Sequence, residues 1–225
     1  MLQLSARRPF RRPSLRSSTA VPRSPRTVLA AAGVVVTLGL VLTGCSGEKE
    51  AAPESSPTPI ASLNKSVTQL PRIEFCPLVP DSAVSDALGG KPDSDAAYGN
   101  GDQEELPDIG KDVVHEIGCS WTGQDGATAR AWVFARPISP TFAREVIASG
   151  AKMKGCRTVP GPAYGKPAAT QLCRLSDGEQ RLRHAGLFGR TWLTCELAAT
   201  DVETAELRTR ADQWCVEVAN ALNTA

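Results

Sequence analysis

The segment at residues 119–134, CSWTGQDGATARAWVF, decides the fold class of this chain. Its second half alternates, and one side of the alternation carries Thr128, Arg130, Trp132 and Phe134. A period of two is typical of a strand whose faces meet different surroundings, and the Asp-Gly pair before it is typical of a tight turn. The segment is therefore predicted to form a β-hairpin.

A related segment lies further along, at residues 173–188, CRLSDGEQRLRHAGLF. It repeats the order of a cysteine, an Asp-Gly turn and a strand that ends in Phe, and residues 190–197 follow as a further alternating strand. A helix is predicted at residues 139–150, where Ser139 and Pro140 form a start signal. The sequence thus has the pattern of a degenerate ββα doubling.

The last helix is expected at residues 200–222. Thr200 and Glu203 have the spacing of a capping box. An apolar stripe at steps of three and four follows, formed by Leu207, Ala211, Trp214, Val218 and Leu222. The predicted class is α+β, an antiparallel sheet with helices packed on one face.

The residues between the N-terminus of the domain and the first hairpin give weaker signals. A short helix is expected from Asp81 to the Gly89-Gly90 pair, with Val84, Ala87 and Leu88 on its buried side. Residues 93–115 are acidic and lack an apolar period, so a long loop is predicted there.

Six cysteines lie in the C-terminal part of the chain, and an even set in an exported protein indicates three disulfides. Fifteen pairings are formally possible. In each half a cysteine lies upstream of the hairpin cysteine, and the last two lie on the final strand and the final helix. This order favours Cys76–Cys119, Cys156–Cys173 and Cys195–Cys215.

An uncharged apolar run at residues 28–42 follows seven arginines near the N-terminus. The run is too short for the hydrocarbon core of a membrane, so it indicates a secretory signal rather than a spanning helix. It ends in Leu42, Thr43, Gly44 and Cys45, which matches a bacterial lipobox. The match implies cleavage before Cys45 and a diacylglyceryl group on its thiol; an uncleaved signal anchor is the alternative.

Three parts are expected: a signal peptide at 1–44, a lipidated cysteine with a disordered tether at 45–70, and one extracytoplasmic domain at 71–225. Residues 1–44 hold seven of the 25 basic residues and none of the 24 acidic ones, so the mature chain has a formal net charge of −6. This balance gives no electrostatic footprint for nucleic acid. Membrane attachment is therefore expected to come from the lipid on Cys45.

The motifs FCPLVPDSAVSDALGG and GCSWTG, with a terminal helix and a lipobox, resemble the small uncharacterised Cys-rich lipoproteins of high-GC Gram-positive bacteria. The likeness covers about residues 75–132. It implies a lipid-anchored extracytoplasmic domain and no particular activity.

Residues for catalysis or metal binding do not assemble in the sequence. His115 and His184 lie on different elements, and no zinc-ligand spacing occurs. Ser120 in GCSWTG lacks the second glycine of a nucleophile elbow, and Asp93, Asp95 and Glu104 form an incomplete EF-hand pattern. We therefore predict no enzyme, no metal and no cofactor.

Trp121, Trp132 and Trp192 lie on predicted strands and could line one sheet face, either as core or as an exposed aromatic platform. The leading functional hypothesis is a binding or adaptor module for an envelope protein. The alternative is a carrier of a small lipid or cell-wall ligand in a cleft between sheet and helices, and an extracytoplasmic enzyme is a minor alternative.

Overall fold

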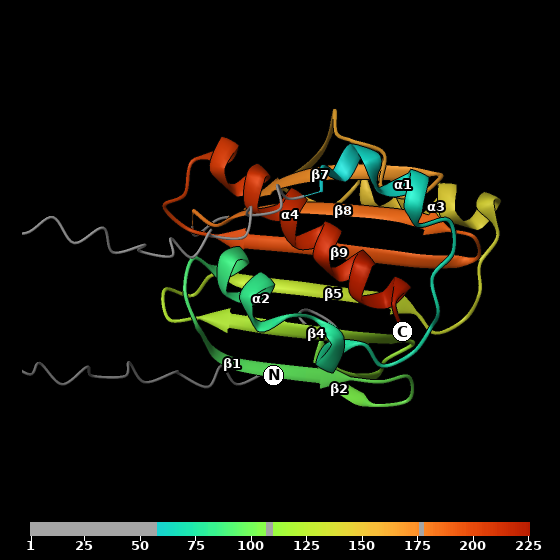
Figure 1. Ribbon diagram of the computed structural model, residues 1–225, viewed down its shortest axis with the longest axis horizontal. Helices are drawn as coiled ribbons and strands as arrows, with labels where there is room; N and C mark the ends of the chain where they lie inside the picture. Colours follow the sequence, from blue (N-terminus) through green and yellow to red (C-terminus); the bar gives the residue numbers. More distant parts are fainter. Residues whose placement is uncertain (1–57, 107–109, 176–177) are drawn as a thin grey trace, which may run out of the picture. The chain divides into compact units, whose positions relative to one another are not determined.

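A seven-stranded antiparallel sheet forms the centre of the domain (Figure 1). The computed structural model describes residues 58–106, 110–175 and 178–225. The strands lie in the order β1-β4-β5-β9-β8-β7-β6. Their bounds, in that order, are Pro92–Tyr98, Glu116–Gly123, Thr128–Phe134, Thr191–Ala199, Gln180–Phe188, Ala168–Arg174 and Cys156–Val159. The predicted α+β class with an antiparallel sheet is confirmed.

The two predicted hairpins lie in opposite halves of this sheet. The first is β4–β5, whose turn is held by a 3.0 Å hydrogen bond from the Ala127 N–H to Asp125 and by Gly126 at φ 84°. The second consists of β7 and β8, and β9 lies between β5 and β8. The strand predicted at residues 190–197 therefore joins the two halves.

Helix α4 (Thr204–Asn223) covers one side of the sheet, which we call the helix face. Its predicted apolar stripe is buried along its whole length and packs on side chains of β5 and β9 such as Val133, Leu193 and Leu197. Helix α2 (Asp81–Leu88) lies beside α4 on the same side. The opposite side of the sheet is called the open face.

The predicted capping box at Thr200 and Glu203 is wrong. The backbone turns at Asp201, at φ 57°, and α4 begins at Thr204 without a side-chain cap. The Thr204 hydroxyl instead donates to Gln180 of β8 at 2.6 Å.

Helix α3 (Pro140–Gly150) packs on the open face, unlike the other helices. Ala185, Leu187 and Trp192 point away from α4, because side chains alternate along a strand, and they form a small apolar surface. Ala143 of α3 is fully buried against it. Because α3 and α4 lie on opposite faces, the fold is not a simple repeat of one ββα unit.

The domain begins earlier than predicted. Residues 58–70 were expected in a tether, yet η1 (Ile60–Ser62) and α1 (Leu63–Ser66) are folded against the helix face. The apolar side chains of this segment, Ile60, Leu63, Val67 and Leu70, are buried in the main core. Their spacing of three and four residues is the helical period, on too short a segment to stand out in the sequence.

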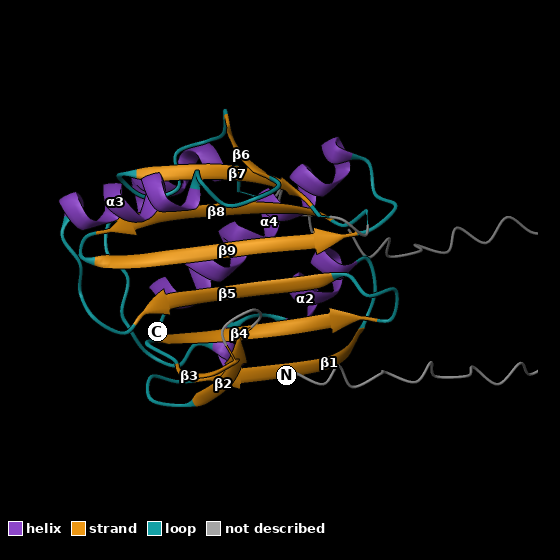
Figure 2. Cartoon of the chain, turned by 180° about the vertical axis from the view of Figure 1, so that it is seen from behind, coloured by secondary structure: helices purple, strands orange, loops and turns teal. Residues whose placement is uncertain are grey.

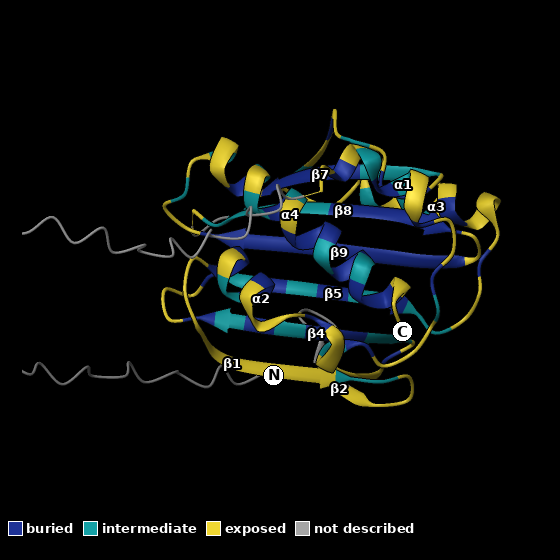
Figure 3. Ribbon diagram, viewed as in Figure 1, coloured by how far each residue is buried: buried dark blue, intermediate teal, exposed yellow. Residues whose placement is uncertain are grey.

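The predicted loop at residues 93–115 contains regular structure. It includes β1 at the edge of the sheet and a separate ribbon of β2 (Gln103–Leu106) and β3 (Gly110–Val113). Strand β1 is exposed on both faces over almost its whole length, so its sequence carries no apolar alternation (Figure 3). Backbone pairing with β4 forms the strand without a burial pattern.

The domain contains the disulfides Cys76–Cys119, Cys156–Cys173 and Cys195–Cys215, the three pairs that the order of the cysteines favours. The first ties η2 (Cys76–Leu78) to β4, the second links β6 to β7, and the third links β9 to α4. The predicted signal peptide, lipobox and lipidated Cys45 lie outside the described residues. Within the described ranges no helix is both long enough and apolar enough to cross a membrane.

Candidate functional site

Among the described residues, no helix covers the open face over β4, β5 and the middle of β9 (Figure 2). Helix α3 packs there against the apolar surface of Trp192, Leu187 and Ala185. No described helix lies over the neighbouring strands, and α2 and α4 are seen behind them. A sheet face without a covering layer exposes its side chains to a partner or to water.

The strand register gathers charged side chains in the middle of this bare area. Arg130 of β5 lies opposite Glu196 of β9, which lies opposite Arg183 of β8. Arg181 is two residues before Arg183 and therefore shares its face. We call Arg130, Trp132, Arg181, Arg183 and Glu196 the arginine cluster.

Glu196 is the buried centre of the arginine cluster, with a side chain that is 1% exposed. Its Oε2 accepts a hydrogen bond from Arg183 Nε at 2.8 Å and lies 2.6 Å from Arg183 Nη2. A buried carboxylate is tolerated only when a close positive charge compensates its lost hydration. Arg183 supplies that charge.

Two further guanidinium groups surround the same carboxylate. Arg130 Nη1 lies 3.5 Å and Arg181 Nε lies 3.9 Å from Glu196 Oε1, an atom that makes no hydrogen bond with any described residue. Arg181 also donates to Glu179 at 2.8 Å. The three guanidinium groups thus lie around the carboxylates of Glu179 and Glu196, and the most exposed guanidinium side chain is that of Arg130, at 43%.

Trp132 lies between two of these arginines. The guanidinium carbons of Arg130 and Arg183 are 5.7 and 5.3 Å from its ring centre, within the range of cation–π attraction. Gly118 lies opposite in β4, and a Cβ there would come within 2.8 Å of Trp132 Cβ and overlap the ring of Tyr98. The glycine therefore lets the Tyr98 phenol lie against Trp132.

Burial raises the pKa of two titratable groups at the edge of the cluster, Tyr98 and Glu116. Burial, and then the charge of Glu116, raises the pKa of Tyr98 to about 12. Burial also raises the pKa of Glu116, although Arg130 and Arg183 oppose this shift. Glu116 is therefore a third carboxylate close enough to interact with Arg130 and Arg183.

The three tryptophans expected on one face are divided between two. Trp132 and Trp192 belong to the open face, but Trp121 points to the helix face and packs edge-on against Trp214 at 5.3 Å. Side chains two residues apart on a strand share a face, so Trp121 lies on the same side of β4 as Cys119, whose disulfide with Cys76 is under the helices. Trp192 is covered by α3, so only Trp132 is half-exposed.

An apolar hollow of about 490 Å³ adjoins the arginine cluster at the start of α3. It is lined by Glu116, Phe134, Arg136, Pro137, Ile138 and Phe142, among others. Phe142 is 47% exposed on its rim. Glu116 also feels the charges of Arg130 and Arg183, so hollow and cluster form one continuous surface.

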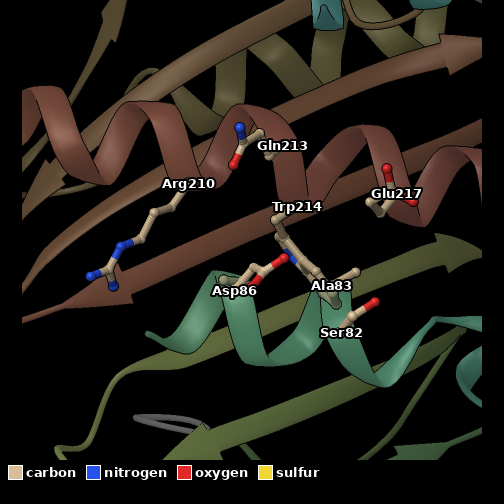
Figure 4. A pocket seen from close by; sticks show the side chains of 8 residues that line it. Ser82, Ala83, Asp86, Arg210, Gln213, Trp214 and Glu217 are labelled. Atoms are coloured by element: carbon tan, nitrogen blue, oxygen red, sulfur yellow. The ribbon is translucent and has the colours of Figure 1, made fainter. Parts of the chain in front are cut away.

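A second groove, of about 360 Å³, lies between α2 and α4 (Figure 4). Trp214 of α4 and Ala83, Ser82 and Asp86 of α2 line it, while Arg210 points away from Asp86 and pairs with Glu206 at 2.9 Å. Its charged groups therefore do not converge on one point. Beneath it, Trp214, Leu207 and the Cys195–Cys215 bridge fill the space between sheet and helix where a carrier cleft was predicted.

His184 forms a buried chain of hydrogen bonds that the sequence did not reveal. Its Nδ1 lies 3.0 Å from the Thr170 hydroxyl and its Nε2 lies 2.7 Å from Asp212 of α4. The order resembles a catalytic triad, but His184 is fully buried, and Gly161 approaches Thr170 so closely that a Cβ there would clash with it. The chain fixes α4 to β8, in agreement with a structural histidine.

The other residues considered for chemistry lie apart. Ser120 is in the middle of β4, and Asp93 and Asp95 are in β1 rather than in a loop. His115 lines the apolar hollow on the open face, whereas His184 is buried in β8. Among the described residues no three His, Cys, Asp or Glu side chains form a group that could hold a metal ion.

No protein-family model and no curated protein matches the chain. Among solved structures, the extracellular domain of PknH from Mycobacterium tuberculosis aligns at 13% identity with a TM-score of 0.43, covering 70% of this chain and all of that one. Similarity at this level assigns no function.

Proposed function

We propose that this chain is a non-catalytic binding module of the cell envelope, held at the extracytoplasmic face of the membrane by a lipid on Cys45. The observation that carries the binding role is the arginine cluster on the bare part of the sheet. Arginine, tryptophan and tyrosine are the residues that most often dominate protein interfaces. Arg130, Trp132 and Tyr98 bring all three types together on one open surface.

Two features support the extracytoplasmic location. The three disulfides are typical of a chain that folds in an oxidising compartment. The lipobox at residues 42–45 supplies the anchor, in agreement with the resemblance to small Cys-rich lipoproteins.

A carrier of a small apolar ligand is the second candidate. The hollow beside Phe142 favours it, since its lining is mainly apolar. It is a surface depression and not an internal cavity, however, whereas carriers usually enclose most of their ligand. The adaptor role therefore comes first.

The anchor is tested by the intact mass of the protein extracted from its native membrane. We expect a chain that begins at lipid-modified Cys45, and a Cys45→Ala variant that is neither processed nor membrane-bound. Unmodified Met1 in the membrane fraction would refute the anchor and leave the binding role to be tested separately.

The binding role is tested by photo-crosslinking in the native cell. A photoreactive residue replaces Ser120, which lies opposite Arg130 on the open face, and the matched control replaces exposed Thr209 on the outer side of α4. We expect one dominant protein adduct from position 120 and none from position 209. The same adducts from both positions, or none from either, would contradict an adaptor that uses the open face.

A further inference from the structure

We propose that the arginine cluster is a carboxylate-binding site that docks an acidic segment, rich in Asp or Glu, of the partner protein. This inference rests on the proposed binding function and specifies its chemistry. Its first support is that Arg183 alone makes the close contacts that compensate Glu196, while the side chain of Arg130 beside it is 43% exposed. An exposed guanidinium on a sheet face without a covering helix is complementary to an acidic partner.

The cluster divides its arginines between two roles. Arg183 is 16% exposed and is bound to Glu196 at 2.6 and 2.8 Å, so it is engaged inside the protein. Arg130 is 43% exposed and only 3.5 Å from the same carboxylate, too far for a hydrogen bond. Arg130 therefore has donors to offer to an incoming group, while Arg183 fixes the platform beneath it.

The surroundings favour a carboxylate as that group. A guanidinium has five N–H donors in a planar fork that matches a carboxylate with two parallel hydrogen bonds. Trp132 restricts Arg130 on one side, and Arg130 donates a hydrogen bond to the Tyr98 phenol oxygen. A restricted side chain loses less conformational entropy when it binds, so the arrangement is preorganised.

The surroundings of the arginine cluster favour a protein as the source of the carboxylate. The exposed aromatic and arginine side chains, together with the apolar hollow at Phe142, form the mixed surface that is typical of a protein partner.

The test measures binding of model peptides to the full mature protein in mild detergent, by calorimetry. The probes are a peptide of alternating Glu and Gly, the same peptide with Gln in place of Glu, inorganic phosphate, and vesicles of phosphatidylglycerol. We expect saturable binding of the Glu peptide that weakens with added salt, and none of the Gln peptide. Tighter binding of phosphate or of the vesicles would overturn the proposal, and so would the absence of peptide binding.

Three variants locate the site. Arg130→Ala is expected to weaken binding of the Glu peptide by about tenfold or more, which is the usual effect of losing a charge-assisted hydrogen bond. Arg130→Lys keeps the charge without the fork and should recover only part of the affinity. Arg208→Ala on α4 removes the same charge from the other side and should change nothing; an equal loss in this control would mean general attraction to a charged surface.

The two proposals fail separately. If the photo-crosslink from position 120 captures a protein but the Glu peptide does not bind, the open face is an interface that does not recognise carboxylates. If the peptide binds at Arg130 while no crosslink forms, the carboxylate site stands and the adaptor role falls.

Discussion

Arg183 and Glu196 form a close ion pair on the open face of the sheet, with Arg183 Nε and Nη2 both directed at one carboxylate oxygen, at 2.8 and 2.6 Å. The pair joins neighbouring strands β8 and β9 directly across from each other. Arg130 approaches the same carboxylate from β5 on the other side. The central pair and the outer arginine should therefore respond differently to substitution.

Replacement of Arg183 by alanine is expected to destabilise the fold by about 3 kcal/mol, because Glu196 is left buried without its main partner. Arg130→Ala should lower the free energy of unfolding by less than about 1 kcal/mol, since that side chain is half-exposed. Urea denaturation measures both. The double variant Arg183→Leu with Glu196→Leu should recover most of the loss, and a double variant as unstable as Arg183→Ala would show that the ion pair is not the cause.

The residues of this cluster were only partly predictable. The alternation of residues 128–134 places Arg130 and Trp132 on one side of a strand, and residues 180–184 alternate in the same way with Arg181 and Arg183. A single glutamate in the apolar strand TWLTCELAA is the signal that was missed, since a charge in a buried strand needs a partner. The pairing of β5 with β9, which brings these residues together, is a long-range contact that no local pattern contains.

The tryptophans show the converse limit. Each was correctly assigned to a strand, but the face on which a strand residue lies depends on register, and a shift of one residue reverses it. Trp121 is two residues from Cys119 and therefore on the same strand face as that cysteine, whose disulfide is buried under the helices. This spacing can be read from the sequence and would have assigned Trp121 to a different sheet face from Trp132.

Glu116 should make stability depend on pH in the acidic range. Its pKa is raised in the folded state above the ordinary value of 4.5, so the native protein binds a proton more readily than the unfolded chain. Stability is then fully present below the unfolded pKa and falls as pH rises through the folded value. Glu116→Gln should therefore be more stable than wild type at neutral pH and lose this part of the pH profile.

The measurement is the urea midpoint at closely spaced pH values from acid to neutral. Glu145→Gln on the exposed side of α3 is the matched control for the loss of one negative charge. A Glu116→Gln profile that runs parallel to that of the wild type would contradict the assignment.

The tyrosines should resist ionisation until the protein unfolds. The chain contains two, Tyr98 and Tyr164; burial and Glu116 raise the pKa of the first to about 12, and complete burial raises the pKa of the second well above its usual range. At pH values near 10, half of the tyrosines of the denatured chain are ionised, whereas the native protein should show almost no phenolate absorbance.

A spectrophotometric titration distinguishes the two residues. In Tyr98→Phe the step at about pH 12 should vanish, leaving Tyr164 to ionise together with unfolding. Because the folded pKa of Tyr98 is raised, the stability linked to its neutral form is lost as pH rises through that step. A native phenolate signal at ordinary tyrosine pKa values would show that the open face leaves Tyr98 accessible to water.

The segment before residue 71 should be an integral part of the domain. Leu63 of α1 is fully buried in the main core, and Leu→Ala at such a position destabilises a protein by about 2–5 kcal/mol. Leu78→Ala is the matched control, because that leucine is 44% exposed in η2 and exposed substitutions usually change stability by less than about 0.5 kcal/mol. Thermal and urea unfolding of the two variants measure the difference, and a chain truncated to residues 71–225 should be less stable than one that begins at residue 58. Equal stability of Leu63→Ala and Leu78→Ala would mean that the segment is a tether after all, with its fold on the helix face contributing nothing.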